Sequence, residues 1–148
     1  MNNALPLAMT MGDASGIGPE IVVKALIETG ERAVVFGSYI VMKDIVDRLD
    51  LDAKIRQVAS PEEARFQIGL IEVIDATQIS EPPPPGVVSP VSGQASFDAV
   101  VAAIAAAQAG QVAGIVTAPI NKAAMRSANI HHPGHTEILA SYSGATRV

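Results

Sequence analysis

The chain has 148 residues, of which 49% are hydrophobic, and it carries a formal net charge of −5. This length and apolar content suit one α/β domain with a sizeable core, whereas the acidic charge and 3% aromatic content argue against a nucleic-acid surface. The absence of cysteine excludes disulfides, cysteine-based zinc sites and a thiol nucleophile. Neither a secretory signal nor an apolar run near the ~20 residues of a membrane span is apparent, so we expect a cytoplasmic protein without a membrane partner.

Strand-like and helix-like segments alternate along the chain. Apolar or alternating runs predict strands at residues 5–9, 33–36, 54–58, 71–74 and 112–116. Apolar residues at helical spacing follow the first strand from Pro19 onward, and they recur over residues 42–49 and 93–109. Four prolines in residues 81–86 predict an extended connector, which fits a surface crossover within one domain better than a linker between domains. The alternation predicts an α/β fold with a mostly parallel sheet.

The first strand leads into a glycine-rich segment at residues 12–20, Gly-Asp-Ala-Ser-Gly-Ile-Gly-Pro-Glu. One interpretation is a tight turn that caps the next helix. The other is that Gly16 and Gly18 let backbone N–H groups at the helix start approach an anion or a catalytic cleft. A conventional dinucleotide fingerprint is disfavoured, because Ile21 stands where G-x-G-x-x-G needs its third glycine. Asp13 would repel a phosphate, so we expect it to cap the turn or to accept a hydrogen bond from a hydroxyl.

The last predicted strand leads into a second polar segment at residues 117–122, Thr-Ala-Pro-Ile-Asn-Lys. Open α/β sheets place ligand sites beyond the carboxyl ends of their strands, and two such junctions suggest a negatively charged ligand. Asn121 is predicted to cap a helix. Lys122 is either solvated or a donor to a carboxylate or phosphate beside the helix start. Arg126, one turn later, either shares that face or is exposed.

A third segment, residues 131–137, reads His-His-Pro-Gly-His-Thr-Glu. Pro133 and Gly134 break any helix, so the three histidines lack the spacing of a helical zinc motif, and we predict no metal site within this loop. His131 is predicted to be exposed. Thr136 and Glu137 could simply begin a capped helix, whereas His135 and Thr136 could instead contact a ligand.

The three segments, in this order, resemble the signature of the 4-hydroxythreonine-4-phosphate dehydrogenase family, and the resemblance extends over essentially the whole chain. One departure is Ala14-Ser15, where the family usually has Pro-Ala. Family members are roughly twice as long, so the chain resembles the N-terminal half of a two-domain fold similar to isocitrate and isopropylmalate dehydrogenases. By that resemblance residues 1–125 supply first-domain elements, and residues 126–148 begin an incomplete second domain.

The resemblance implies an oxidoreductase that uses NAD or NADP and a divalent metal (Zn, Mg or Co) to oxidise a small phosphorylated hydroxy acid, whose β-keto product then decarboxylates. In the pyridoxal-phosphate pathway the substrate is 4-phosphohydroxy-L-threonine. Sister groups use 4-phospho-D-threonate or -erythronate, which residues 130–140 resemble more, or a cis-dihydrodiol dicarboxylate. The enzymes of this family are homodimers.

The resemblance also assigns residues. His135 and Thr136 are implied as substrate contacts, and the metal ligands and catalytic residues are implied to lie beyond Val148. Possible support for the active site comes from Asp13, Gly16, Gly18, Asn121 and Lys122.

Two other classes of function stay open at this point. The implied fold is similar to that of phosphate acyltransferases, so an acyl- or phosphotransferase is one alternative. A non-catalytic fragment that binds an anion is the other. The segment Pro133 to Glu137 favours the dehydrogenase. Since the chain holds no plausible set of three metal ligands, we expect residues 1–148 alone to be inactive.

Overall fold

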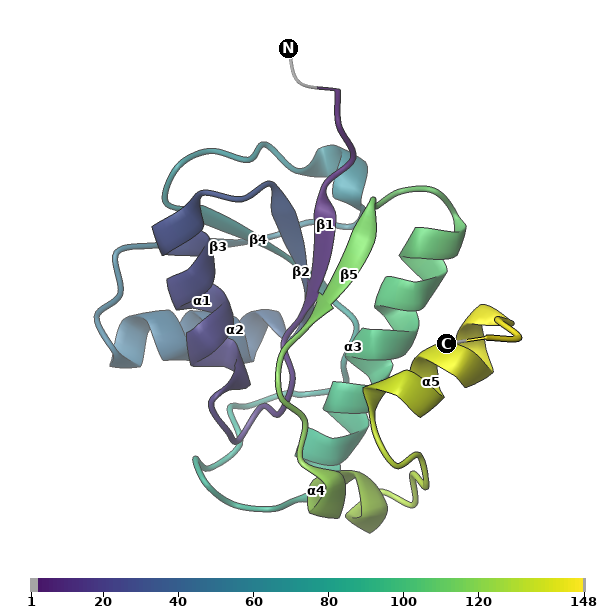
Figure 1. Ribbon diagram of the computed structural model, residues 1–148. Coiled ribbons are helices and arrows are strands. Elements are labelled where there is room, and N and C mark those ends of the chain that lie inside the picture. Colours follow the sequence, from purple (N-terminus) through teal and green to yellow (C-terminus); the bar gives the residue numbers. More distant parts are fainter. Residues whose placement is uncertain (1–2, 148) are drawn as a thin grey trace.

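The computed structural model describes residues 3–147, and its elements alternate as the sequence predicts (Figure 1). Met1, Asn2 and Val148 lie outside the described residues. The strands are β1 (Leu7–Thr10), β2 (Ala33–Gly37), β3 (Lys54–Gln57), β4 (Leu70–Asp75) and β5 (Gly114–Thr117). The helices are α1 (Gly18–Thr29), α2 (Tyr39–Arg48), α3 (Pro90–Gln108), α4 (Lys122–Ser127) and α5 (His135–Ser143), with a short 3-10 turn, η1, at Pro61–Glu63.

The five strands form one parallel sheet in the order β3-β4-β2-β1-β5. The expectation of an α/β fold with a mostly parallel sheet is therefore confirmed. Central strand β2 is buried along its whole length, as expected for a parallel strand that is covered on both faces. Because all strands run the same way, the loops that follow them gather at one end of the sheet, which is the lower end in Figure 1.

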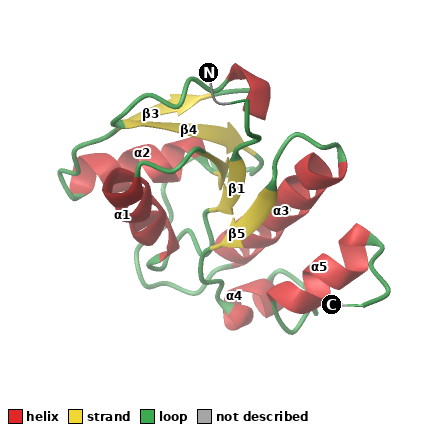
Figure 2. Ribbon diagram, turned by 45° about the horizontal axis from the view of Figure 1, so that its top comes forward, coloured by secondary structure: helices red, strands yellow, loops and turns green. Residues whose placement is uncertain are grey.

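Helices cover both faces of the sheet (Figure 2). On one face α1 and α2 pack through Val23 and Met42 against inward residues such as Val35 of β2. On the other face α3 packs against the alternate β2 residues, Val34 and Phe36, through small side chains, chiefly Ala103 and Ala106. Successive side chains of β2 thus contribute to two cores on opposite faces of the sheet. Burial of apolar surface in each core stabilises the fold by roughly 25 cal/mol per Å².

Helix α3 is buried on two sides. A third apolar cluster joins Val100 and Ile104 of α3 to Met125, Ile130 and Ile138, so α4 and α5 lie on the side of α3 that faces away from the sheet. By length and composition α3 would also pass as a membrane span, although no such span was expected, but half of its apolar window is buried inside this fold. Its packing is that of a core helix.

Most element bounds differ by one to three residues from the sequence-based expectation, as at α3 and β5. Helix α3 begins three residues before the predicted Gly93, because Ser89 accepts a hydrogen bond from the backbone of Ser92 (3.2 Å) and Pro90 occupies the first turn. Strand β5 begins at Gly114 and extends to Thr117, whereas residues 112–116 were predicted.

The proline-rich residues 81–86 run over the surface before α3. The N–H of Gly86 donates to the carbonyl of Ser15 over 2.7 Å, and α3 then packs on the strands that precede the connector. Residues 126–147 pack on α3 through α5, so they extend the layer that α3 begins. Their assignment to a second domain stays a prediction.

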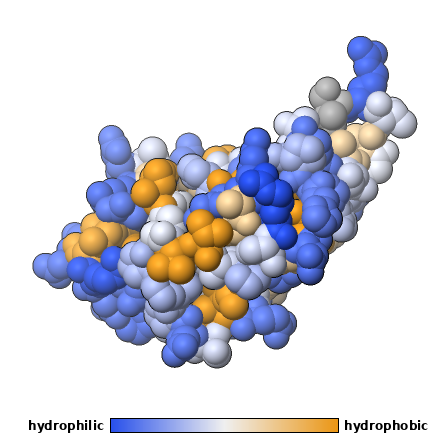
Figure 3. Space-filling view, turned by 90° about the horizontal axis from the view of Figure 1, so that it is seen from below, coloured by the Kyte–Doolittle hydropathy of each residue, from blue (hydrophilic) through white to orange (hydrophobic). Residues whose placement is uncertain are grey.

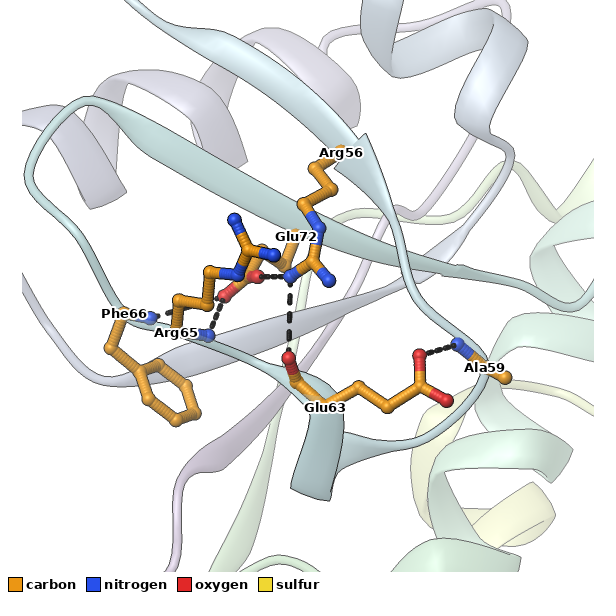
Figure 4. Close-up of polar contacts among 6 residues, drawn as sticks. All are labelled: Arg56, Ala59, Glu63, Arg65, Phe66 and Glu72. Carbon is orange, nitrogen blue, oxygen red and sulfur yellow. Dashed lines mark hydrogen bonds and ion pairs between the residues drawn. The ribbon is translucent and has the colours of Figure 1, made fainter.

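A buried carboxylate fixes the loop at the outer edge of the sheet (Figure 4). Glu72 of β4 is only 2% exposed. It accepts hydrogen bonds from the guanidinium of Arg56 on β3 and from the backbone N–H groups of Arg65 (2.7 Å) and Phe66 (3.1 Å). The guanidinium and the two N–H groups therefore compensate the buried negative charge of Glu72, which would otherwise be costly to remove from water.

Candidate functional site

The two loops predicted to form a ligand site follow neighbouring strands. Strands β1 and β5 pair in parallel, with Thr10 in register with Thr117. Beyond them, the backbone N–H of Asp13 donates to the carbonyl oxygen of Pro119 over 2.9 Å. The glycine-rich segment and the Asn121-Lys122 segment are thus joined directly at the carboxyl end of the sheet, where α/β folds bind ligands.

Asp13 closes the first loop. Its Oδ1 accepts the N–H of Ser15 over 3.0 Å, and its carbonyl accepts the N–H of Gly16 over 3.1 Å. The side chain is 9% exposed. Of the two roles foreseen for Asp13, capping the turn is the one that the geometry displays.

The glycines of this loop have a packing function. A Cβ on Gly12, whose φ is +75°, would lie 2.4 Å from the carbonyl oxygen of Pro119. A Cβ on Gly18 would lie 2.3 Å from the carbonyl oxygen of Met11, and one on Gly16 would lie 2.9 Å from Oδ2 of Asp13. The close approach of backbone at Gly12 and Gly18 therefore requires glycine, whether or not the start of α1 also meets an anion.

Asn121 caps α4, because its Oδ1 accepts the N–H of Ala124 over 3.0 Å. This places Lys122 in the first turn of α4 with an exposed side chain. Arg126 follows one turn later and is also exposed. Within residues 3–147, neither Lys122 nor Arg126 forms an ion pair with a carboxylate.

Helix α5 begins at the residues implied as substrate contacts. His135 and Thr136 are its first two residues, and the preceding Gly134 provides no side-chain cap. A Cβ on Gly134 would lie 3.9 Å from Cε of Lys122 and 3.4 Å from Oε2 of Glu137. The geometry thus brings the second and third sequence motifs together, with the lysine stem alongside the start of α5.

His135 is the titratable residue of this region with a displaced pKa. Burial lowers the pKa of His135 below its ordinary value of 6.5, so the neutral imidazole is favoured. Its Nε2 is buried and has no hydrogen-bond partner within the described chain. A buried imidazole nitrogen without a partner is costly, so Nε2 of His135 is free to bond to a group outside the described chain.

Between α4 and the loop that follows it lies a hollow of about 250 Å³, which is lined by Lys122, Arg126, His131, His132 and Pro133. Sequence reasoning left His132 without a role and expected His131 to be exposed, and His131 is exposed. The grouping was missed because a loop and a short helix supply the residues, with no shared periodicity. The spacing of Lys122 and Arg126, four apart on a helix, was the available signal.

An aromatic cluster holds one wall of this hollow. The ring of His132 stacks on Phe97 of α3 with a centroid separation of 5.8 Å and an interplanar angle of 15°. Tyr142 of α5 contacts both rings edge-on, at 5.4 Å from Phe97 and 5.9 Å from His132. Gln108 also donates to the carbonyl of Ser143 over 3.1 Å, so the C-terminal end of α5 is tied to α3.

The residues present do not fit a metal ion. Among residues 3–147, no group of three or more His, Asp or Glu side chains is placed to hold one. The glycine segment also lacks the third glycine of a dinucleotide fingerprint. We therefore assign no metal or cofactor contact to a residue of this chain.

The profile of the family described as Pyridoxal phosphate biosynthetic protein PdxA matches residues 29–148. The chain belongs to the PdxA family. The chain is 46% identical over 145 residues to a 4-hydroxythreonine-4-phosphate dehydrogenase from Beijerinckia indica, covering 97% of this chain and 43% of that protein. It is 40% identical over 154 residues to a D-threonate 4-phosphate dehydrogenase from Cupriavidus necator, covering 100% of this chain and 46% of that protein.

A solved structure gives the same result for the fold. A putative 4-hydroxythreonine-4-phosphate dehydrogenase from Salmonella typhimurium superposes with a TM-score of 0.92 at 37% identity, covering 97% of this chain and 46% of that one. The sequence-based resemblance to this family is therefore confirmed. The chain spans less than half the length of these relatives.

Proposed function

We propose that this chain supplies part of the substrate site of an NAD(P)-dependent, metal-assisted dehydrogenase that acts on a small phosphorylated hydroxy acid. The observation that carries the proposal is the juxtaposition of Lys122 with the start of α5, where His135 and Thr136 lie, in a chain 46% identical to a relative named 4-hydroxythreonine-4-phosphate dehydrogenase. The cation, the hydroxyl and the neutral imidazole supply the kinds of contact that a phosphorylated hydroxy acid needs.

A nicotinamide cofactor held outside the described residues would supply the oxidant that converts the secondary alcohol of the substrate to a ketone. The resulting β-keto acid then loses carbon dioxide. The role of this chain is to hold the substrate. Thr136 donates a hydrogen bond to the substrate from its hydroxyl, and His135 forms a hydrogen bond with the substrate through Nε2. Because burial lowers the pKa of His135, this contact is made by an uncharged imidazole. The metal ligands and the groups that move the proton are proposed to lie in the part of the relatives that this chain does not match.

Two substrates compete within this proposal. The relative from Beijerinckia indica is named as a 4-hydroxythreonine-4-phosphate dehydrogenase, whereas the relative from Cupriavidus necator is named as a D-threonate 4-phosphate dehydrogenase. Both carry a phosphate monoester and a secondary alcohol, so the site described here serves either one.

The test uses a chimera in which residues 1–147 of this chain replace the matching part of the Beijerinckia indica relative. We call this protein the extended enzyme. With a divalent metal and NAD or NADP, it is expected to reduce the cofactor when given 4-phosphohydroxy-L-threonine or 4-phospho-D-threonate, with release of carbon dioxide. The 148-residue chain alone is expected to give no turnover. A folded extended enzyme that reduces neither cofactor with any phosphorylated hydroxy acid would refute the proposal.

A further inference from the structure

Three serine side chains are buried between the glycine-rich segment and the first turns of α3. Ser15 belongs to the segment and is 5% exposed, whereas Ser92 and Ser96 lie one turn apart on α3 and are 0% and 1% exposed. A hydroxyl group removed from water is costly unless it forms hydrogen bonds. Each of these three hydroxyls finds a partner across the boundary between the segment and the helix.

The hydroxyl of Ser96 holds the backbone of Gly12. Ser96 Oγ lies 3.0 Å from the carbonyl oxygen of Gly12 and 2.9 Å from that of Ser92, so it donates a three-centre hydrogen bond. Gly12 is buried, and a buried carbonyl group needs a hydrogen-bond partner. Ser96 therefore fixes the chain immediately before Asp13, whose N–H donates to the carbonyl of Pro119.

Ser15 is held by its side chain and by its backbone. Ser15 Oγ and Ser92 Oγ are 2.6 Å apart, and Ser92 Oγ also accepts a hydrogen bond from Ser89 over 3.2 Å. The carbonyl of Ser15 accepts the N–H of Gly86, which lies in the connector that leads into α3. The glycine-rich segment is thus bonded to α3 at both ends of residues 12–15, which limits any shift of the segment along the helix.

The same turns of α3 also fix the position of α4. A Cβ on Gly93 would lie 2.1 Å from the carbonyl oxygen of Ala124, so the backbones of the two helices are in direct contact there. Ala124 lies in the first turn of α4, which Asn121 caps and Lys122 begins. Residues 92–96 of α3 therefore contact both segments that meet at the carboxyl end of the sheet.

We propose that Ser15, Ser92 and Ser96 are positioning residues that set the separation between the glycine-rich segment and α4. The inference rests on the proposed function for its kinetic consequence, because the two segments meet beside the proposed substrate contacts. The three serines are buried and act through the backbone that they hold, without touching the substrate. A displacement of about 1 Å within an active site can lower the rate by up to about a hundredfold.

The first measurement is amide hydrogen exchange by NMR on the 148-residue chain, which needs no turnover. The N–H of Asp13 reports on the junction with Pro119, and the N–H of Val35 in central strand β2 reports on global unfolding. In Ser96→Ala, exchange at Asp13 is expected to speed up at least about tenfold more than exchange at Val35, because the junction opens locally.

Ser38→Ala is the matched control. It also removes a fully buried hydroxyl, but Ser38 Oγ caps α2 by accepting the N–H of Val41 over 3.3 Å. Its loss is expected to act through global stability, so exchange at Asp13 and at Val35 should speed up by the same factor.

The second measurement is steady-state kinetics of the extended enzyme, at a temperature where every variant is folded. Ser15→Ala and Ser96→Ala are each expected to lower kcat/KM for the phosphorylated substrate about tenfold, whereas Ser38→Ala should leave it within about twofold. Ser15→Ala combined with Ser92→Ala should match Ser92→Ala alone, because both changes remove the same hydrogen bond.

Three results would overturn the inference. One is exchange at Asp13 that responds no more to Ser96→Ala than to Ser38→Ala. Another is a kcat/KM of Ser96→Ala within about twofold of the parent, since the serines would then stabilise the segment without affecting the reaction. The third is additive losses for Ser15→Ala and Ser92→Ala. If the parent extended enzyme gives no turnover, the proposed function fails, and exchange at Asp13 still decides whether the serines position the segment.

Discussion

The backbone N–H of Asp13 donates to the carbonyl oxygen of Pro119 over 2.9 Å and joins two loops from opposite ends of the chain. The contact forms only because Gly12 lets the first loop lie against the second. With φ at +75° and no room for a Cβ, position 12 tolerates glycine alone.

Gly12→Ala is therefore predicted to lower the free energy of unfolding by about 2–4 kcal/mol, since it adds both a clash and backbone strain. Gly30→Ala is the matched control, because Gly30 has φ +64° but nothing within 4 Å of the added Cβ. It should cost only the strain, about 1 kcal/mol. Urea denaturation compares the two, and equal losses would mean that the approach to Pro119 contributes nothing.

Glu72→Gln is predicted to lower the free energy of unfolding by about 1–3 kcal/mol. The amide cannot accept as the carboxylate does from Arg56 and from two backbone N–H groups, and the site is buried (Figure 4). Glu20→Gln breaks the exposed Lys24 pair on α1 and is expected to cost less than about 0.5 kcal/mol. A loss at Glu72 no larger than at Glu20 would show that the loop of residues 59–66 does not depend on this carboxylate.

The lowered pKa of His135 predicts a pH dependence of stability. Because the unfolded imidazole binds a proton near its ordinary pKa of 6.5 and the folded one binds it only at lower pH, protonation favours unfolding. Stability should be full above about pH 6.5 and should fall as the pH drops from there toward the folded-state pKa. Urea denaturation between pH 7.5 and 5 measures this trend, and His135→Gln should lose that part of it. A ring titration of His135 above 6.5 in NMR spectra would contradict the assignment.

The chain is predicted to self-associate. Strand β5 is an edge strand, and the apolar side chains of Ile17, Val88 and Val91 are 59%, 52% and 53% exposed. At the end of the molecule where the strands finish, such side chains form patches between polar ones (Figure 3). Large exposed apolar areas often mark a contact with another protein, so we expect a second copy of the chain to cover some of these side chains.

Size-exclusion chromatography with light scattering measures the association. Val88→Lys should weaken it, whereas Ile68→Lys, at a fully exposed residue in the loop before β4, should not. A monodisperse species of 15.3 kDa that unfolds cooperatively would contradict the prediction.

Much of this arrangement could be predicted from the sequence. The alternation of strands and helices predicted the parallel sheet, and the glycine-rich and Asn121-Lys122 segments were correctly placed after strands. The early start of α3 at Pro90 was missed because the helical apolar pattern begins only later, although Ser89-Pro90 is a recognisable start. Nothing local in the sequence pairs Glu72 with Arg56, or His132 with Phe97, since those contacts depend on strand register and on how α5 packs.

The most direct test of the central claim is a kinetic comparison of His135→Ala with its parent in the extended enzyme. The account predicts that kcat/KM for the phosphorylated substrate falls roughly tenfold to a hundredfold, as expected for a lost contact worth ~1.5–3 kcal/mol. The KM for NAD should stay within about twofold, and Lys24→Ala should leave both values unchanged. If His135→Ala leaves kcat and the substrate KM within about twofold of the parent, the start of α5 is not the substrate site.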